Sequence, residues 1–267
     1  MVPLVDYLWE RKKQKGYLFV PYHAPGDPDW NTSLDIVRSL IDSGADSIEF
    51  GLPFSDPAAD GPVLQRAFKR ILKQPYSWDQ FFRFMATIKS EYPEMQFLTI
   101  GYANLFYQAG MKKIFKRLEK VGVNGVIIPD IPIEEKRNMK RDTIALQSAP
   151  ISWINFITPT VTNNRLESIC EDADGFIYLV SYKGVTGSNQ FNLKPLKPVI
   201  KKIKQKSNVP LLVGFGVKTR EHVQQCIEMT DGFIIASRLH EIIEHNLKNT
   251  VQIPKMIQKE IKKLLVL

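Results

Sequence analysis

The sequence predicts an α/β fold in which eight βα units close into a (β/α)8 TIM barrel. Short runs rich in β-branched and aromatic residues alternate with amphipathic helical stretches along the whole chain. Eight such runs in 267 residues leave about 33 residues for each, the length of one right-handed βα unit. The first run leads into His-Ala-Pro-Gly-Asp-Pro at 23–28. This is not the Gly-rich first turn that an open, dinucleotide-binding sheet would carry.

Each expected element is defined by its periodicity and by the Gly, Pro or polar residues that bound it. The expected strands are 17–23, 47–51, 96–101, 125–129, 151–156, 175–181, 210–214 and 232–236. The expected helices between them are 33–43, 62–72, 79–91, 111–121, 134–147, 164–170, 196–206, 220–229 and 237–247. We expect an extra N-terminal helix before Gly16 to cap the closed end, and an amphipathic C-terminal helix at 251–267 on the outside. No linker-like stretch interrupts the series, so a single domain spanning 1–267 is expected.

Composition narrows the class of protein. Hydrophobic residues make up 44% of the chain and charged residues 24%, which is typical of a soluble globular protein. The N-terminus lacks a signal-peptide core, and no run is long and apolar enough to cross a bilayer, so no membrane association is expected. Cys170 and Cys226 are isolated, which favours a cytoplasmic location. The four histidines have no metal-ligand spacing, so no metal site is expected.

The net charge of +8 has two interpretations. Basic residues gather at 11–15, 201–206 and 259–263, which could form a surface for a polyanion. They could equally be the solvated faces of amphipathic helices. The second interpretation is favoured because no stacking aromatic residues are interleaved with the charges. We therefore expect no nucleic-acid partner, while a small anionic substrate is compatible with the charge.

The stretch 46–67 carries two acids in different settings. Glu49 lies in a short strand, where a buried parallel strand should be apolar, and Asp60 lies on the loop that follows. In a barrel both would face the mouth formed by the C-terminal ends of the strands. Two carboxyl groups in a dry and a wet environment can divide proton transfer and charge stabilisation between them. The alternative is structural, with Glu49 in an ion pair and Asp60 as a helix cap.

The last loops have the features of an anion site. The seventh strand ends in Gly214-Phe215-Gly216, and the eighth passes through Ala236 into Ser237 at the start of a helix. Glycines allow the backbone to approach an oxyanion, and helix N-termini attract one. The sixth loop adds Thr186 and Gly187. A small phosphate-bearing substrate is therefore expected, although such glycines also occur in ordinary turns and Ser237 also suits an N-cap.

Residues 49–62 read Glu-Phe-Gly-Leu-Pro-Phe-Ser-Asp-Pro-Ala-Ala-Asp-Gly-Pro. This run resembles the signature of the tryptophan synthase α subunit family, an acid followed by Gly-x-Pro-Phe-Ser-Asp-Pro-x-Ala-Asp-Gly-Pro. Shorter matches follow the family's order at 26–28, 102–104, 129–132, 184–187 and 214–217. The resemblance therefore covers the whole chain.

The resemblance implies a lyase that cleaves indole-3-glycerol phosphate to indole and glyceraldehyde 3-phosphate in tryptophan biosynthesis. It implies an α2β2 heterotetramer with a β subunit that carries pyridoxal phosphate, and no cofactor in this chain. Glu49 would transfer protons and Asp60 would face the indole nitrogen. The implied substrate-binding residues are Tyr22, Ile100, Ile127, Tyr178, Thr186, Gly187, Phe215, Gly216, Ala236 and Ser237. The implied contacts with the β subunit, on exposed loops, are Pro53, Asp56 and Asn104.

Some of these positions have a second interpretation. The residue pattern alone would place Ile100 and Ile127 in the barrel core, and Tyr178 lies mid-strand, where a phenol either satisfies a core hydrogen bond or reaches the substrate. Within the resemblance, Thr186 would anchor the closed sixth loop onto Asp60.

The chain departs from the family pattern in four places, the first being Ala24-Pro25, which replaces the usual Thr-containing pair after the first strand. Tyr182-Lys183 stands where Arg-x is usual, Ala236 replaces a glycine, and Arg238 replaces a small residue and could bond a phosphate. Ala236 requires a negative φ. These departures motivate an alternative, a weakly catalytic subunit that serves mainly as allosteric activator of the β subunit. A third hypothesis is that the chain is another phosphate-binding barrel enzyme, such as a sugar-phosphate isomerase. The neighbouring indoleglycerol-phosphate synthase would be expected to carry lysines at its strand ends, and no expected strand here ends that way.

Overall fold

The strands form one parallel sheet that closes on itself. The computed structural model describes residues 2–144, 151–181 and 191–265, and within these ranges nine parallel strands are ordered β5-β4-β3-β2-β1-β9-β8-β7-β6. They are β1 Leu18–His23, β2 Ile48–Gly51, β3 Phe97–Ile100, β4 Val123–Ile127, β5 Ser152–Trp153, β6 Asn155–Ile157, β7 Ile177–Val180, β8 Leu211–Gly214 and β9 Gly232–Ile235. All eight expected strands are present, and the predicted (β/α)8 barrel is confirmed.

The fifth expected strand is divided in two. β5 pairs with β4 and β6 pairs with β7, and only Ile154 separates them. The N–H group of Ile154 donates to the carbonyl of Val126 at 2.9 Å, so the chain stays against β4 through the break. The two short strands therefore join the ends of the sheet into a ring.

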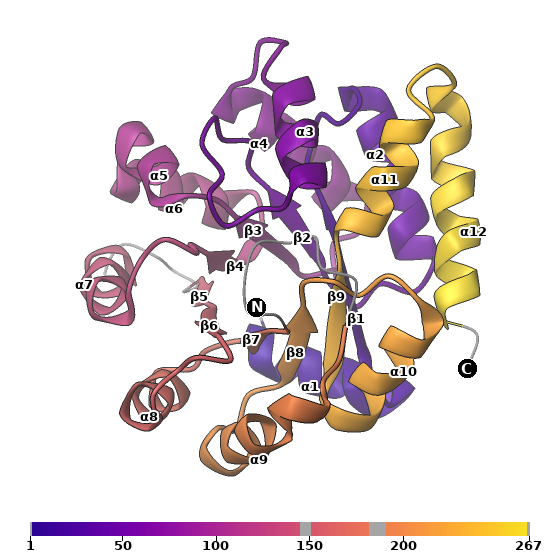
Figure 1. Cartoon of the computed structure of the whole chain (residues 1–267). Coiled ribbons are helices and arrows are strands. Elements are labelled where there is room, and N and C mark those ends of the chain that lie inside the picture. Colours follow the sequence, from indigo (N-terminus) through magenta and orange to yellow (C-terminus); the bar gives the residue numbers. More distant parts are fainter. Residues whose placement is uncertain (1, 145–150, 182–190, 266–267) are drawn as a thin grey trace.

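Helices surround this ring (Figure 1). Those in the described ranges are α1 Leu4–Lys15, α2 Trp30–Asp42, α3 Pro62–Ile71, α4 Trp78–Glu91, α5 Ala103–Ala109, α6 Met111–Lys120, α7 Ile133–Ile144, α8 Asn163–Glu171, α9 Lys197–Lys206, α10 Arg220–Met229, α11 Ser237–His245 and α12 Ile253–Leu265, with 3₁₀ turns at Lys194–Leu196 and Thr250–Gln252. The expected C-terminal helix, α12, packs outside against α2 and α11. None of these described helices has the length and apolar character needed to span a membrane.

The expected N-terminal helix, α1, closes one end of the barrel. Leu4 and Leu8 are buried in the same cluster as the inward-facing strand residues. The helix is held by Asp46, a fully buried acid that pairs with Arg11 at 3.0 Å and Lys15 at 2.8 Å. Much of the basic cluster at 11–15 is thus engaged with a buried carboxylate of its own chain, which fits the helical rather than the polyanion interpretation.

Helix α5 was not expected from the sequence. Its first residue, Ala103, donates its N–H to the Asp130 carboxylate at 2.9 Å, a contact with the next βα loop. Gly110, at φ 81°, then separates α5 from α6. Asn104, expected on a loop, therefore lies in the first turn of a helix. This helix has only seven residues, and the acceptor for its first N–H group lies 27 residues further along the chain. No neighbouring residue in the sequence therefore marks its start.

Candidate active site

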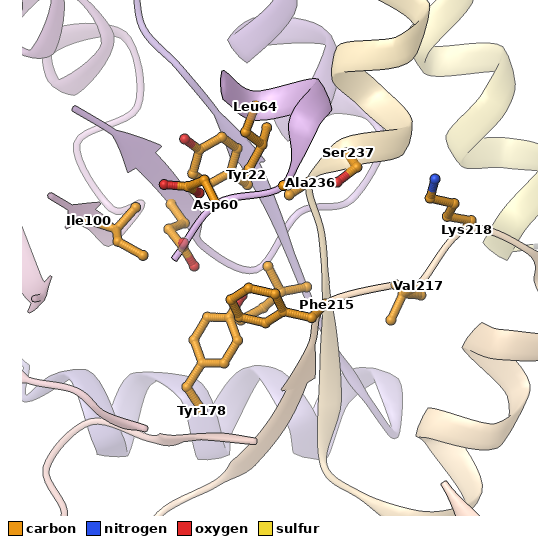
Figure 2. A pocket seen from close by; sticks show the side chains of 14 residues that line it. Tyr22, Asp60, Leu64, Ile100, Tyr178, Phe215, Val217, Lys218, Ala236 and Ser237 are labelled. Atoms are coloured by element: carbon orange, nitrogen blue, oxygen red, sulfur yellow. The ribbon is translucent and has the colours of Figure 1, made fainter. Parts of the chain in front are cut away.

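A cavity opens at the C-terminal ends of the strands. It encloses about 530 Å³ including its mouth, and predicted site residues from several strands and loops line it. These residues are Tyr22, Glu49, Asp60, Ile100, Tyr178, Phe215, Gly216, Ala236 and Ser237. Figure 2 shows Tyr22 and Asp60 beside the start of α3, Tyr178 and Phe215 below them, and Ala236 and Ser237 where α11 begins. The structure therefore brings the two ends of the predicted site together.

Glu49 points into the barrel because of strand alternation. Its neighbours Ile48 and Phe50 pack in the outer layer between strands and helices, so the side chain between them faces inward. It is 1% exposed, and its Oε2 has no hydrogen-bond partner in the described part of the chain. Burial, with a smaller contribution from the charge of Asp60, raises the pKa of Glu49 to about 8. Glu49 is therefore a protonated acid at neutral pH.

Asp60 lies at the mouth, on the loop before α3. Its Oδ2 accepts a hydrogen bond from the Tyr102 hydroxyl at 2.7 Å, and that hydroxyl accepts one from the N–H group of Ala59 at 2.9 Å. Burial raises the pKa of Asp60 to about 6, while the Tyr102 hydrogen bond acts in the opposite direction. Asp60 is thus mainly a carboxylate at neutral pH, and the two acids have separate acidities.

The structural alternative for this pair is not supported. Glu49 forms no ion pair with any described residue. Asp60 does not cap α3, because the N-cap is Gly61 and no side chain bonds the first turn. A buried carboxyl group without an ion pair, Glu49, close to a half-buried one that caps no helix, Asp60, is typical of a catalytic site.

Aromatic rings form one wall of the cavity. Tyr22 lies in register with Glu49 on the adjacent strand, and Tyr178 meets Phe215 edge-on, with ring centroids 5.8 Å apart. Two glycines make room for the tyrosines, since a Cβ on Gly51 would lie 1.8 Å from the Tyr22 hydroxyl and one on Gly214 would lie 2.2 Å from the Tyr178 ring. The Tyr22 hydroxyl is buried without a partner among the described residues. The wall is therefore largely aromatic, and the Tyr22 hydroxyl in it is an unsatisfied donor.

Ile127 lies apart from this wall. It is fully buried in the inner cluster of the barrel and does not line the cavity, whereas Ile100 does. The residue pattern alone allows either isoleucine to pack in the barrel core. In this structure Ile127 occupies a core position and Ile100 lines the cavity. Thr186 and Gly187, together with Tyr182, lie outside the described residues.

The opposite side of the cavity is suited to an anion. Phe215 and Gly216 adopt positive φ angles of 66° and 91°, which turn the backbone beneath the cavity, and the Ser181 hydroxyl donates to the Phe215 carbonyl. Helix α11 begins at Ser237, so its free N–H groups and dipole favour negative charge there. Ala236 has the negative φ expected for it, −120°. Lys218, which sequence reasoning missed, also lines the cavity and pairs with Glu241 at 2.7 Å.

Comparisons with known proteins agree with this geometry. The family model described as tryptophan synthase alpha chain matches residues 8–265. The tryptophan synthase alpha chain of Leptospira biflexa is 36% identical over 244 residues, 91% of this chain and 90% of the relative. The chain belongs to the tryptophan synthase alpha chain family. The family expected from the sequence is thereby confirmed, and the reading as another phosphate-handling barrel is wrong.

Solved structures extend the likeness to three dimensions. Tryptophan synthase subunit alpha from Legionella pneumophila has a TM-score of 0.85 and 28% identity, with 99% of each chain covered. A chain from the tryptophan synthase a2b2 complex of Pyrococcus furiosus has a TM-score of 0.82 and 27% identity, covering 94% of this chain and 98% of that one. The barrel is therefore shared with tryptophan synthase alpha chains over nearly its full length.

Three expectations from the sequence need correction. Arg238 pairs with Glu260 at 2.7 Å and Glu241 at 3.5 Å, so carboxylates already occupy the guanidinium that was expected to be available to a phosphate. Pro53 is buried rather than exposed, because the N–H group of Leu52 still bonds the Ile100 carbonyl and holds the loop against β3. Asn104 is exposed, but on α5 instead of a loop. Asp56 is exposed on its loop, as expected.

The raised pKa of Glu49 predicts that this residue lowers the free energy of unfolding at alkaline pH. Glu49 binds its proton more tightly in the folded state, where its pKa is about 8, than at its ordinary value of 4.5. Its contribution is therefore fully present below pH 4.5 and is lost as the pH rises through 8. Because Gln cannot ionise, Glu49→Gln should be more stable than the wild type at pH 9, by on the order of a few kcal/mol.

Urea unfolding of both proteins at pH 5 and pH 9 measures this difference. The gain in the free energy of unfolding should be large at pH 9 and should shrink toward pH 5. Glu94→Gln, a change at an exposed glutamate, is the matched control. The same difference at both pH values would show that Glu49 does not carry a raised pKa.

Proposed function

We propose that Glu49 and Asp60 catalyse the reaction of the tryptophan synthase alpha chain in this protein. That reaction is the retro-aldol cleavage of indole-3-glycerol phosphate to indole and glyceraldehyde 3-phosphate. The observation that carries the proposal is a protonated and an ionised carboxyl group lining one cavity, with a glycine turn and a helix N-terminus on its other side. Each half of the substrate has a chemically matched region there.

The two acids divide the work. Glu49, protonated at neutral pH, donates its proton to indole C3, which places positive charge on the ring nitrogen. The Asp60 carboxylate stabilises that charge, and the Tyr102 hydrogen bond holds it in place. The Glu49 carboxylate then accepts the proton of the hydroxyl on the carbon attached to C3. As that proton leaves, the C3–carbon bond breaks, its electron pair returns to the indole ring, and the aldehyde forms. Glu49 ends protonated, ready for another turnover.

The remaining predicted residues are proposed to bind substrate. Tyr22, Ile100, Tyr178 and Phe215 would hold the indole ring, with Ile127 packed behind them in the barrel interior. The phosphate would rest on the backbone of Gly216, Ala236 and Ser237, with Thr186 and Gly187 approaching from the sixth loop. Among the buried polar atoms that lack partners in the described chain, two belong to residues that line the cavity, the Tyr22 hydroxyl and Oε2 of Glu49. Bound substrate would supply partners for both, which removes the cost of burying them.

We also propose docking to a β subunit in an α2β2 heterotetramer, the assembly named for the Pyrococcus furiosus relative. Asp56, on the loop that also carries Asp60, and Asn104, two residues after Tyr102, are exposed and would contact the partner. The buried Pro53 would support the loop that carries Asp56. Pyridoxal phosphate belongs to the β subunit, and the alpha chain works without a cofactor. A cytoplasmic location is part of the proposal and is supported by two free thiols, Cys170 and Cys226.

The release of indole from indole-3-glycerol phosphate, with and without the β subunit, tests this function. We expect release in both conditions and faster release in the complex. No detectable release in either condition would contradict the lyase. The alternative, an activator with weak turnover of its own, is not favoured, because both acids and the anion-binding turn are in place.

A further inference from the structure

A buried ionic network lies directly behind the cavity and takes no part in the mechanism above. His240 in α11 and Asp27 in the loop after β1 are both 0% exposed, and His240 Nδ1 lies 2.8 Å from Asp27 Oδ2. The N–H group of Ala24 donates to His240 Nε2 at 3.3 Å. Because Nε2 accepts, this network assigns the ring proton to Nδ1, which donates to Asp27. Both ring nitrogens are therefore committed to the loop after β1.

Arg70 extends the network to α3. Its Nε and Nη2 atoms lie 3.0 Å and 2.9 Å from the two carboxylate oxygens of Asp27, a bidentate pair. Burial raises the pKa of Asp27, but the hydrogen bonds from His240 and Arg70 outweigh it and the net shift is downward, so Asp27 remains ionised. Glu244, one turn beyond His240, pairs with Arg70 at 3.4 Å and with Arg66 at 2.6 Å. We call Asp27, Arg70, His240 and Glu244 the clamp, because it ties α3 to α11 at two successive turns.

Both clamped helices begin in the active site. Helix α3 starts immediately after Asp60-Gly61, and Gln65 in its first turn donates to the Asp60 carbonyl at 2.9 Å. Helix α11 starts at Ser237, the proposed phosphate end. The separation between the catalytic carboxylate and the anion site therefore depends on how these two helices are held.

We propose that the clamp fixes this separation and that His240 is its central positioning residue. Apolar contacts between two helices usually stabilise a fold at least as much as a buried ion pair does. Directional hydrogen bonds, in addition, fix the relative geometry of the helices. His240 contacts no reacting atom in this account. It holds the first turn of α11 against the loop after β1, so that the N–H groups at Ser237 meet the phosphate while Asp60 meets the indole. This inference rests on the proposed function, because it assigns the phosphate to the start of α11.

His240→Leu removes both hydrogen bonds while keeping an apolar side chain. We expect the Kd for glycerol 3-phosphate and the KM for indole-3-glycerol phosphate each to rise about tenfold, the cost of losing a charge-assisted hydrogen bond. Inhibition by indole should change less than about threefold, because Tyr22 is the wall residue whose ring meets His240, edge-on at 5.5 Å, and Leu keeps an apolar contact there. His240→Asn keeps an N–H donor at the position of Nδ1 and should restore both constants to within about threefold of wild type. His245→Leu, at an exposed histidine of the same helix, is the matched control.

Calorimetric titration with glycerol 3-phosphate separates positioning from a merely structural role. Loss of folded protein alone would lower the number of binding sites and leave Kd and KM unchanged, and that result would overturn the proposal. If His240→Leu fails to fold, Arg70→Lys supplies the test, because it keeps the charge and loses the bidentate geometry. A wild-type Kd in folded Arg70→Lys would overturn the proposal as well. If the wild type itself does not bind glycerol 3-phosphate, the proposed anion site is wrong and this inference falls with it.

Discussion

Glu49→Gln is expected to lower kcat for indole release by at least about 10²–10⁴-fold, the usual contribution of a general acid–base group. Glu49 is needed twice in one turnover, first as the donor to C3 and then as the acceptor of the hydroxyl proton. Gln has nearly the same shape and can do neither. KM should change little, because the aromatic wall and the anion site remain. Stopped assays of indole release with saturating substrate would measure the loss.

The same variant must remain folded for this result to be meaningful. Its far-UV circular dichroism and its binding to the β subunit should match those of the wild type, since Glu49 forms no hydrogen bond from Oε2 and no ion pair in the described chain. Retained turnover in the folded variant would show that the proton-transfer group lies elsewhere in the cavity.

Asp60→Asn is expected to lower kcat on the order of 10²–10³-fold, or a few kcal/mol, through lost stabilisation of the positive charge on the indole ring. Asn keeps an oxygen for the Tyr102 hydroxyl, so the loop should stay in place and only the charge is removed. Single-turnover rates measured without the β subunit would isolate this effect from docking.

Asp56→Asn is the matched control, because Asp56 is an exposed acid on the same loop. Its cleavage rate without the β subunit should equal that of the wild type. Equal rates for Asp60→Asn and the wild type would show that Asp60 does not stabilise the transition state.

Much of the architecture could be predicted because it depends on local patterns. Glu49 was recognised from one acid in an apolar strand, and the flanking Ile48 and Phe50 explain why it faces inward. The glycine turn at 214–216 and the helix start at Ser237 were likewise visible as local signals, and both line the cavity. Strand order followed from the handedness of repeated βα units.

What could not be predicted depends on contacts between distant residues. Helix α5 starts where Asp130 accepts a hydrogen bond from Ala103, and no nearby residue indicates it. The sequence around Arg238 leaves its guanidinium available to a phosphate, whereas the fold places Glu260 beside it, from 22 residues further along the chain.

The clamp shows the same limit. The hydrogen bond between His240 and Asp27 spans 213 residues, so neither residue carries a local sign of its role. The split between the pKa values of Glu49 and Asp60 likewise needed burial that only the closed barrel provides.

A crystal structure with bound indole propanol phosphate, a substrate analogue with an indole ring and a phosphate tail, tests the central claim most directly. We expect the indole nitrogen within hydrogen-bonding distance of the Asp60 carboxylate, C3 facing Glu49, and the phosphate on the N–H groups at Gly216 and Ser237. An indole ring bound away from both acids, or a phosphate bound elsewhere than at the start of α11, would contradict it.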